Sequence, residues 1–235
     1  MPAAERAACW CVVPAAGQGA RMGASVPKQY LEIAGHSVLL HTLMRLARHP
    51  RIAGLVVALA RDDARWPGLE HLEGKPVRTA VGGDERADSV LAGLRALPAV
   101  IAAEQPVLVH DAARPLLRAA DIDRLLDAGA DCADGAVLAA PVRDTLKRAD
   151  ADGHIAATEP RAGLWRALTP QLAPRGVLER ALLDAAAAGV LLTDEAMALE
   201  RIGLRPILVE GHEDNLKITT PADLAYAGFW LARHP

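Results

Sequence analysis

Short apolar runs alternate along the chain with longer segments in which apolar positions recur at helical spacing. The runs, each bounded by turn residues, predict strands at about 8–13, 55–60, 77–81, 107–110, 136–141 and 207–210. The helical segments lie at about 38–49, 84–97, 119–130, 174–188, 194–202 and 221–233. This alternation predicts an α/β protein with a Rossmann-like, mostly parallel sheet and helices on both faces.

One stretch departs from the alternation. The segment "RDTLKRADADGHIAATEPRAGLW", residues 143–165, holds two short extended pieces around an "ADADGH" turn and is too polar for a central strand. A projecting β-hairpin fits it best. Since no linker and no second compositional regime is found, we predict one domain over residues 1–235, with a β-hairpin arm at about 142–165.

Composition narrows the class of protein. Apolar residues make up 51% of the chain but aromatic residues only 3%, so the core is expected to consist of Ala, Val, Leu and Ile. A net charge of -3 argues against a general nucleic-acid or membrane-surface binder. The three cysteines have no partners at zinc spacing, residues 1–9 lack the long apolar region that a signal peptide would show, and no apolar run reaches the length of a membrane span. We therefore expect a soluble, cytoplasmic protein.

The stretch "PAAGQGARMGASVPKQY", residues 14–30, follows the first apolar run and is rich in glycine. It is not a dinucleotide fingerprint, because Met22 stands where the last glycine of G-x-G-x-x-G belongs. It is not a P-loop either, because Lys28 is preceded by proline and followed by glutamine. What remains is a strand that leads into a long glycine-rich loop with two cations.

Such a loop can hold a phosphate chain. Its amides at Gly17 and Gly19 would bind phosphate oxygens, and Arg21 and Lys28 would neutralise charge at one phosphorus. The alternative is a glycine-rich turn with two solvated surface cations. The combination of two cations, a preceding strand and glycines where close approach is needed favours phosphate binding.

Two further blocks follow predicted strands. In "GGDERADSV", Gly83, Asp84 and Ser89 come where a strand leads into a helix, at the edge that carries ligands in open α/β sheets, although Asp84 could also be only a helix cap. In "VLVHDAARP", Asp111 ends an apolar strand, where a carboxylate beside a triphosphate would suit Mg²⁺. The alternative is a turn aspartate that pairs with Arg114.

Eight blocks in order carry a resemblance. They are "PAAGQGARM", "PKQY", "GGDERADSVLAGL", "VHDAARP", "APVRDTLKR", "LWRALTPQ", "TDEAMALE" and "DNLKIT". Together they resemble the 2-C-methyl-D-erythritol 4-phosphate cytidylyltransferases of the non-mevalonate isoprenoid route, from near residue 9 to near residue 233. The resemblance implies the nucleotide-diphospho-sugar transferase type of fold. It also implies transfer of CMP from CTP to methylerythritol phosphate, giving 4-diphosphocytidyl-2-C-methyl-D-erythritol and pyrophosphate.

The resemblance also implies roles for individual residues. The catalytic residues would be Arg21 and Lys28 at the α-phosphate of CTP. The nucleotide-binding residues would be Ala15, Ala16, Gly17, Gly19, Gly83, Asp84, Ser89 and Asp111. The substrate-binding residues would be Arg114, Thr145, Arg161, Thr169, Thr193 and Lys217. The cofactor would be Mg²⁺ or another divalent cation, with Asp111 on the metal or on substrate hydroxyls.

The arm carries an expectation about assembly. In the resembling family the arm clasps a second subunit, and its residues complete the partner's site, so a homodimer is expected. Two rival functions remain at this point. One is a cytidylyltransferase for another polyol phosphate, such as ribitol 5-phosphate, or a hexose-1-phosphate nucleotidyltransferase. The other is a non-enzymatic nucleotide-binding or scaffold protein, against which the presence of Arg21, Lys28 and Asp111 argues.

Overall fold

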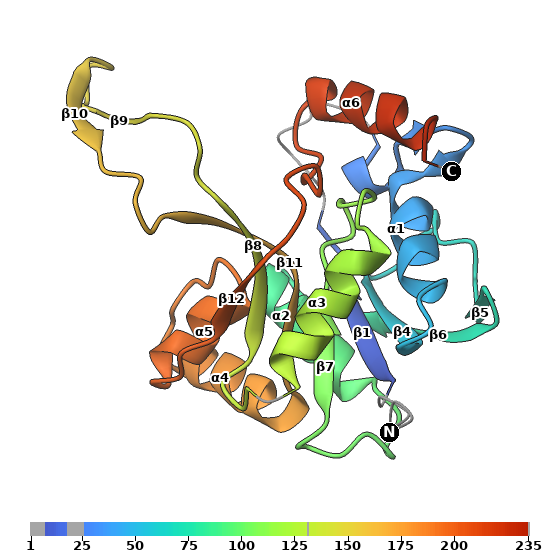
Figure 1. Cartoon of the computed structure of the whole chain (residues 1–235). Coiled ribbons are helices and arrows are strands. Elements are labelled where there is room, and N and C mark those ends of the chain that lie inside the picture. Colours follow the sequence, from blue (N-terminus) through green and yellow to red (C-terminus); the bar gives the residue numbers. More distant parts are fainter. Residues whose placement is uncertain (1–7, 18–25, 131, 235) are drawn as a thin grey trace, which may run out of the picture.

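The computed structural model describes residues 8–17, 26–130 and 132–234. An eight-stranded sheet lies at its centre, in the order β12-β8-β11-β7-β1-β4-β6-β5 (Figure 1). These strands are β1 (Cys9–Pro14), β4 (Ile52–Leu59), β5 (His71–Leu72), β6 (Lys75–Val81), β7 (Pro106–Val109), β8 (Ala136–Pro141), β11 (Trp165–Pro174) and β12 (Ile207–Glu210). The helices are α1 (Val38–Ala47), α2 (Arg86–Arg95), α3 (Ala119–Gly129), α4 (Arg175–Ala187), α5 (Glu195–Arg201) and α6 (Pro221–Leu231), with a 3-10 turn, η2 (Lys28–Tyr30).

The direction of the strands confirms the predicted sheet. β6, β4, β1 and β7 are paired in parallel, and β12 is parallel to β8. β11 is antiparallel to both β7 and β8, and the short β5 is antiparallel to β6. The six predicted strands and six predicted helices are all present, with ends that differ by a few residues. The sheet is therefore mixed and mostly parallel.

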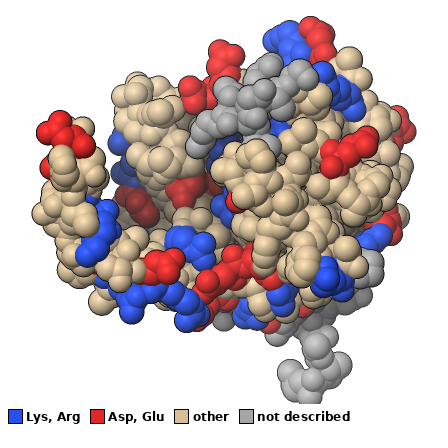
Figure 2. Space-filling view, turned by 90° about the horizontal axis from the view of Figure 1, so that it is seen from above, with Lys and Arg blue, Asp and Glu red and all other residues tan. Residues whose placement is uncertain are grey.

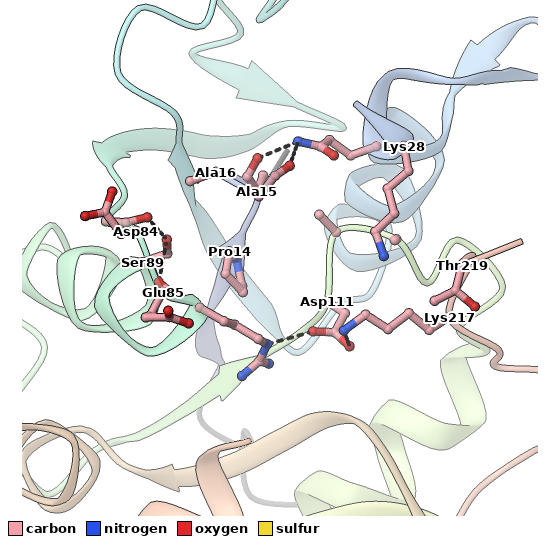
Figure 3. A pocket seen from close by; sticks show the side chains of 16 residues that line it. Pro14, Ala15, Ala16, Lys28, Asp84, Glu85, Ser89, Asp111, Lys217 and Thr219 are labelled. Atoms are coloured by element: carbon pink, nitrogen blue, oxygen red, sulfur yellow. Dashed lines mark hydrogen bonds and ion pairs between the residues drawn. The ribbon is translucent and has the colours of Figure 1, made fainter. Parts of the chain in front are cut away.

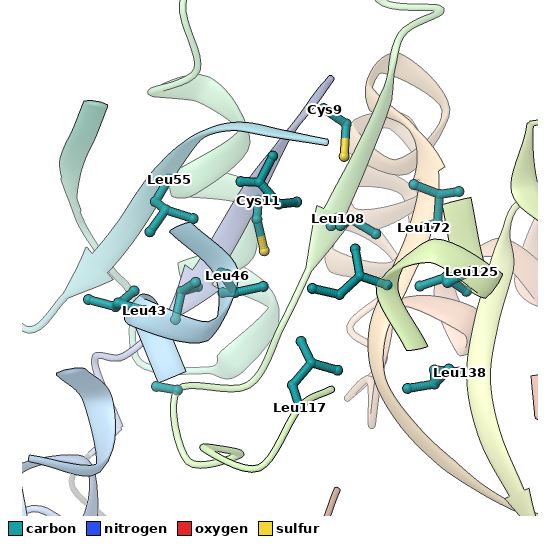
Figure 4. Close-up of a cluster of buried hydrophobic side chains, with 14 of the residues drawn as sticks. Cys9, Cys11, Leu43, Leu46, Leu55, Leu108, Leu117, Leu125, Leu138 and Leu172 are labelled. Atoms are coloured by element: carbon teal, nitrogen blue, oxygen red, sulfur yellow. The ribbon is translucent and has the colours of Figure 1, made fainter. Parts of the chain in front are cut away.

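Side-chain alternation along β1 explains the two layers of helices. Cys9, Cys11 and Val13 belong to one core cluster, which α1 and α3 complete through Leu43 and Leu125 (Figure 4). The intervening Trp10 and Val12 belong to the opposite cluster, which α2, α4 and α5 complete. Because successive strand residues point to opposite faces, a continuous apolar run covers both faces of the sheet. The two buried cysteines are free thiols, and burial raises the pKa of Cys9 to about 12.

The central strand β11 was not predicted. Its first residue, Trp165, fell at the end of the predicted arm, and the rest, including "ALTPQLAP", is interrupted by prolines and polar residues. Thr169 and Gln171 are nevertheless buried, because their polar atoms have partners: the Thr169 hydroxyl accepts from the Asp111 amide (3.1 Å), and Gln171 Oε1 accepts from the Ala196 amide (2.8 Å). Hydrogen bonds to the loop after β7 and to the start of α5 therefore replace the apolar pattern on which the prediction rested.

The arm has the predicted form. β9 (Leu146–Ala149) and β10 (Ile155–Glu159) pair in a separate antiparallel ribbon that stands away from the main sheet (Figure 1). Seen from above, a hollow lies between this arm and the rest of the molecule, and side chains of both charges gather along its floor (Figure 2). Ile155 is 69% exposed at the arm, and Leu164 and Trp165 are also exposed at its base. The arm thus presents apolar surface that the other described residues of the chain leave exposed.

Two smaller ribbon strands, β2 (Glu32–Ile33) and β3 (His36–Ser37), lead into α1. A third core cluster joins them to α6, through Ile33, Ile218 and Trp230. α6 begins at residue 221, where a helix was predicted, and Thr220 is its N-cap before Pro221. In the described part of the chain, none of the helices combines the length and the apolarity that crossing a membrane requires.

Candidate active site

A pocket of about 590 Å³ opens at the carboxyl ends of β1, β6 and β7 (Figure 3). It is lined by residues 14–17, 28–29, 83–86, 89, 111–113, 217 and 219. Five separate segments of the chain therefore converge there. Ligands bind at this edge in open α/β sheets, because the loops after parallel strands all emerge on the same side.

The loop after β1 is tied to the segment that carries Lys28. The buried side chain of Gln29 donates from Nε2 to the carbonyl oxygens of Ala15 (2.8 Å) and Gly17 (3.0 Å). Figure 3 shows the neighbouring Lys28 side chain pointing into the pocket. Gln29 thereby fixes the position of Lys28 relative to the first residues of the loop after β1. The sequence analysis missed this residue.

The opposite wall of the pocket is closely packed, because a glycine, Gly82, leaves no space for a side chain there. Ser89 is 3% exposed and lies beside Ala16, and a Cβ atom at Gly82 would come within 2.6 Å of both Ser89 Oγ and Ala16 Cβ. At the start of α2 the N-cap is Glu85, and its amide donates to Asp88 Oδ2 (3.2 Å). Asp84 therefore lines the pocket and is not the helix cap.

Asp111 is the anionic centre of the site. Arg86 Nε lies 3.0 Å from Oδ1, and Arg114 Nε and Lys217 Nζ each lie 3.1 Å from Oδ2. Burial alone would raise the pKa of this carboxyl, but the charges of Arg86, Lys217 and Arg114 hold it well below its usual range. The carboxylate is therefore ionised and fixed in direction by three cations. The pairing of a turn aspartate with Arg114 that the sequence left open is present, together with two further partners.

A buried network of hydrogen bonds holds Asp111 on its side away from the pocket. The Thr169 hydroxyl lies between the Asp111 amide and His110 Nδ1 (2.9 Å), and Asn215 Nδ2 donates to the Thr169 carbonyl (2.7 Å). Arg114 Nη1 in turn donates to the Asn215 carbonyl (2.7 Å). Burial lowers the pKa of His110 to about 4, so its ring is neutral near pH 7. These hydrogen bonds thus connect β7, β11 and the segment before Lys217.

Arg86 is the second residue that the sequence analysis missed. It is the first residue of α2, and its guanidinium contacts Asp111 on one side and both oxygens of Glu195 on the other. Burial lowers the pKa of Arg86, but the charges of Glu195 and Asp111 outweigh that effect and raise it above its ordinary value. Its partner Glu195 is 2% exposed at the start of α5.

The model of the IspD family, described as 2-C-methyl-D-erythritol 4-phosphate cytidylyltransferase, matches residues 9–233. The 2-C-methyl-D-erythritol 4-phosphate cytidylyltransferase of Stenotrophomonas maltophilia (strain K279a) is 62% identical over 227 residues, which cover 97% of this chain and 98% of that protein. The chain belongs to the IspD family. It is a cytidylyltransferase of isoprenoid biosynthesis, as the resemblance implied.

Solved structures of IspD proteins have the same fold. A crystal structure of a 4-diphosphocytidyl-2C-methyl-D-erythritol synthase has a TM-score of 0.82 and 37% identity, and covers 96% of this chain and 99% of that one. The Francisella tularensis 2-C-methyl-D-erythritol 4-phosphate cytidylyltransferase has a TM-score of 0.80 and 31% identity, with 95% and 99% covered. The fold expected from the sequence is confirmed by these likenesses.

The structure of this IspD chain brings most of the predicted site residues together. Those that line the pocket are Ala15, Ala16, Gly17, Lys28, Gly83, Asp84, Ser89, Asp111 and Lys217. Arg114 and Thr169 lie directly behind Asp111 in the network described above. Gly19 and Arg21 lie outside the described residues.

Three predicted substrate residues lie away from the pocket of their own IspD chain. Thr145 lies just before β9 and Arg161 just after β10; both are exposed, and Arg161 donates to the Arg143 carbonyl. Thr193 is exposed in the turn before α5, and its hydroxyl donates to Met197 Sδ (3.5 Å). Their predicted roles therefore require another chain or a substrate that reaches beyond the pocket.

A substitution at Gly82 tests whether the closely packed wall shapes the nucleotide site. We expect Gly82→Ala to raise the KM for CTP about tenfold, because the added methyl group must push Ala16 and Ser89 apart. Gly228→Ala is the control, since a Cβ there meets no atom within 4 Å. Steady-state kinetics at saturating second substrate measure the effect. A KM for CTP equal to that of the control would show that this wall does not shape the nucleotide site.

Proposed function

We propose that this chain transfers CMP from CTP to 2-C-methyl-D-erythritol 4-phosphate and releases pyrophosphate, and that the pocket after β1, β6 and β7 is where the transfer occurs. One observation supports this proposal most directly: Lys28 and Lys217 line the same pocket, and the carboxylate of Asp111 is held there among the cations described above. This arrangement suits a nucleotide. Its base would pack against the closely packed wall around Gly82, and its phosphates would lie over the cations.

The reaction needs little from the protein in proton transfer. A phosphate oxygen of methylerythritol phosphate attacks the α-phosphorus of CTP, a new P–O bond forms, and the bond to the pyrophosphate oxygen breaks with its electron pair. The nucleophile is already an anion, so catalysis comes from positioning two anions and stabilising charge on the α-phosphate. We assign that stabilisation to Lys28 and, outside the described residues, to Arg21. Lys217 and Arg114 would hold the phosphate of the second substrate.

We further propose that the base and the diol are recognised separately. Ala15, Ala16, Gly83, Asp84 and Ser89 would hold the cytosine, largely through backbone groups, and the phosphates would bind the amide of Gly17 and, outside the described residues, that of Gly19. Thr169 and Thr193 would serve the diol of methylerythritol phosphate. The burial of Ser89 and the closely packed wall at Gly82 support the first assignment.

A divalent cation, Mg²⁺ by its preference for oxygen, would enter with the phosphates of CTP. Among the described residues no group of three or more His, Cys, Asp or Glu could cage a metal ion, but Asp111, whose pKa its cationic partners hold well below the usual range, lines the pocket together with Asp84 and Glu85. This donor set fits an ion held mainly by phosphate oxygens, which is the usual form of Mg²⁺ binding in nucleotide enzymes. Such an ion would neutralise charge on the leaving pyrophosphate.

We also propose a homodimer joined through the arm. A two-stranded ribbon is only marginally stable by itself, and this one exposes Ile155 at its tip and Trp165 at its base. A second subunit would cover that surface. Thr145 and Arg161, which lie away from the pocket of their own chain, would then complete the partner's site. The free buried thiols Cys9 and Cys11 fit a reducing compartment, and we place the reaction in the cytoplasm.

The test is release of pyrophosphate from CTP with two acceptors. We expect rapid release with methylerythritol phosphate and, at equal concentrations, release at least about a hundredfold slower with ribitol 5-phosphate, because sites that hydrogen-bond a substrate reject analogues with misplaced hydroxyls. A coupled phosphate assay measures both rates. Preference for ribitol 5-phosphate would contradict the proposal and favour the rival polyol phosphate activity.

A further inference from the structure

Arg86 lies at a junction of three elements. From the first turn of α2, its Nε donates to Asp111 Oδ1 (3.0 Å) at the end of β7; a dashed line marks this contact at Asp111 in Figure 3. Its two terminal nitrogens donate to the two oxygens of Glu195 at the start of α5, one of them at 3.1 Å. One guanidinium thus uses both of its edges on two carboxylates from distant parts of the chain.

The partner of Arg86 is itself fixed. Glu195 is 2% exposed, and the residues on either side of it are held by Gln171 of β11: Gln171 Nε2 donates to Asp194 Oδ2 (3.0 Å), and its Oε1 accepts from the Ala196 amide (2.8 Å). A bidentate arginine pair is rigid because two parallel hydrogen bonds define the plane of both groups. Arg86 therefore has little freedom to turn away from Asp111.

We infer that Arg86 is a positioning residue for the transfer reaction: held by Glu195, it fixes the carboxylate of Asp111 in the orientation that the reaction uses. This inference rests on the proposed function of the pocket. The two other cations on Asp111 both contact the second oxygen, Oδ2, so Arg86 alone among the described partners holds Oδ1. Without it the carboxylate could rotate about its Cβ–Cγ bond.

Lysine separates geometry from charge at this position. Arg86→Lys keeps one positive charge between the two carboxylates, but an ammonium cannot form a bidentate pair with Glu195 and also span to Asp111. Arg86→Ala would leave two buried carboxylates without that charge and risks misfolding, so it is not the variant of choice. Arg95→Lys is the matched control: it lies on the same helix, and its pair with Glu179 is at the surface.

The experiment measures kcat and KM for CTP with methylerythritol phosphate, with circular dichroism to confirm the fold. We expect Arg86→Lys to lower kcat about 10- to 100-fold and to change the KM for CTP less than about threefold, whereas Arg95→Lys has neither effect. Glu195→Gln should lower kcat about 3- to 10-fold, because it leaves Arg86 in place but loosens it.

The decisive measurement is a double-mutant cycle. If Arg86 acts through Asp111, Arg86→Lys should lower kcat less than about threefold further when Asp111→Asn is already present. Losses that multiply in full, or a folded Arg86→Lys protein with the kcat of wild type, would overturn the inference. The wild-type protein in the same assay keeps the two proposals apart. An inactive wild type contradicts the proposed function, and an active wild type with multiplying losses contradicts only the role of Arg86.

Discussion

Lys28→Ala is expected to lower kcat by roughly 10²- to 10³-fold while CTP still binds measurably, because Lys28 is assigned to charge that develops at the α-phosphate in the transition state. The nucleotide would keep its contacts with the wall around Ser89 and with the amides after β1, so ground-state binding should fall much less than turnover. Steady-state pyrophosphate release at saturating substrates measures the first quantity, and calorimetric titration with CTP measures the second.

Lys75→Ala is the control for this variant. Lys75 begins β6, near the outer edge of the sheet and outside the pocket, so its removal should leave both kcat and CTP affinity unchanged. Equal losses of CTP affinity and of kcat/KM in Lys28→Ala would mean that Lys28 binds ground state and transition state alike. Turnover near that of wild type would remove Lys28 from catalysis altogether.

The sheet and its helices were predictable because their signals are local. β1 is a six-residue apolar run, and the helices on either side of the sheet have the spacing of one buried face. β11 was not predictable in this way, since the burial of Thr169 and Gln171 depends on partners at Asp111 and Ala196 that lie far along the chain. Periodicity reports burial of apolar surface, and this strand is buried with polar groups that are satisfied.

The residues of the candidate site show the same difference between local sequence signals and long-range contacts. Lys28, Asp84 and Asp111 were found because each follows a strand or a glycine-rich loop, where the sequence itself marks the ligand edge. Lys217 came from the resemblance alone, and the structure places its ammonium 3.1 Å from Asp111. The pairing of Arg86 with Glu195 spans 109 positions, and no spacing rule connects residues so far apart.

Gln29 was missed for a different reason. Glutamine beside a lysine in a loop is most often solvated, and only the three-dimensional return of this segment onto the loop after β1 gives its amide two carbonyl partners. Supporting residues of this kind carry no chemical signature of their own. They are recognisable once the reactive groups that they hold are in place, which is why sequence reasoning identified more of the chemistry than of its support.

Mixing two inactive variants is expected to restore activity if sites are shared between subunits. Lys28→Ala disables the pocket of its own chain, and Arg161→Ala would disable the pocket of its partner. In a heterodimer of the two, one site carries both substitutions and the other carries neither. Random pairing makes half of the dimers mixed, so activity should recover to about a quarter of the wild-type value. Co-expression with two affinity tags and sequential purification isolates the mixed dimer, in which recovery should approach about half.

Arg148→Ala supplies the matched control for the arm. Like Arg161, Arg148 is an exposed arginine of the arm; it lies in β9 and pairs with Glu159 of its own ribbon (2.6 Å), so Arg148→Ala should remain active as a homodimer. Complementation distinguishes a shared site from one that closes within a chain, because only a shared site can gather an intact Lys28 and an intact Arg161 from two defective chains. Purified heterodimers without recovered activity would show that Arg161 serves its own chain. A monomer in solution at assay concentration would contradict the proposed dimer itself.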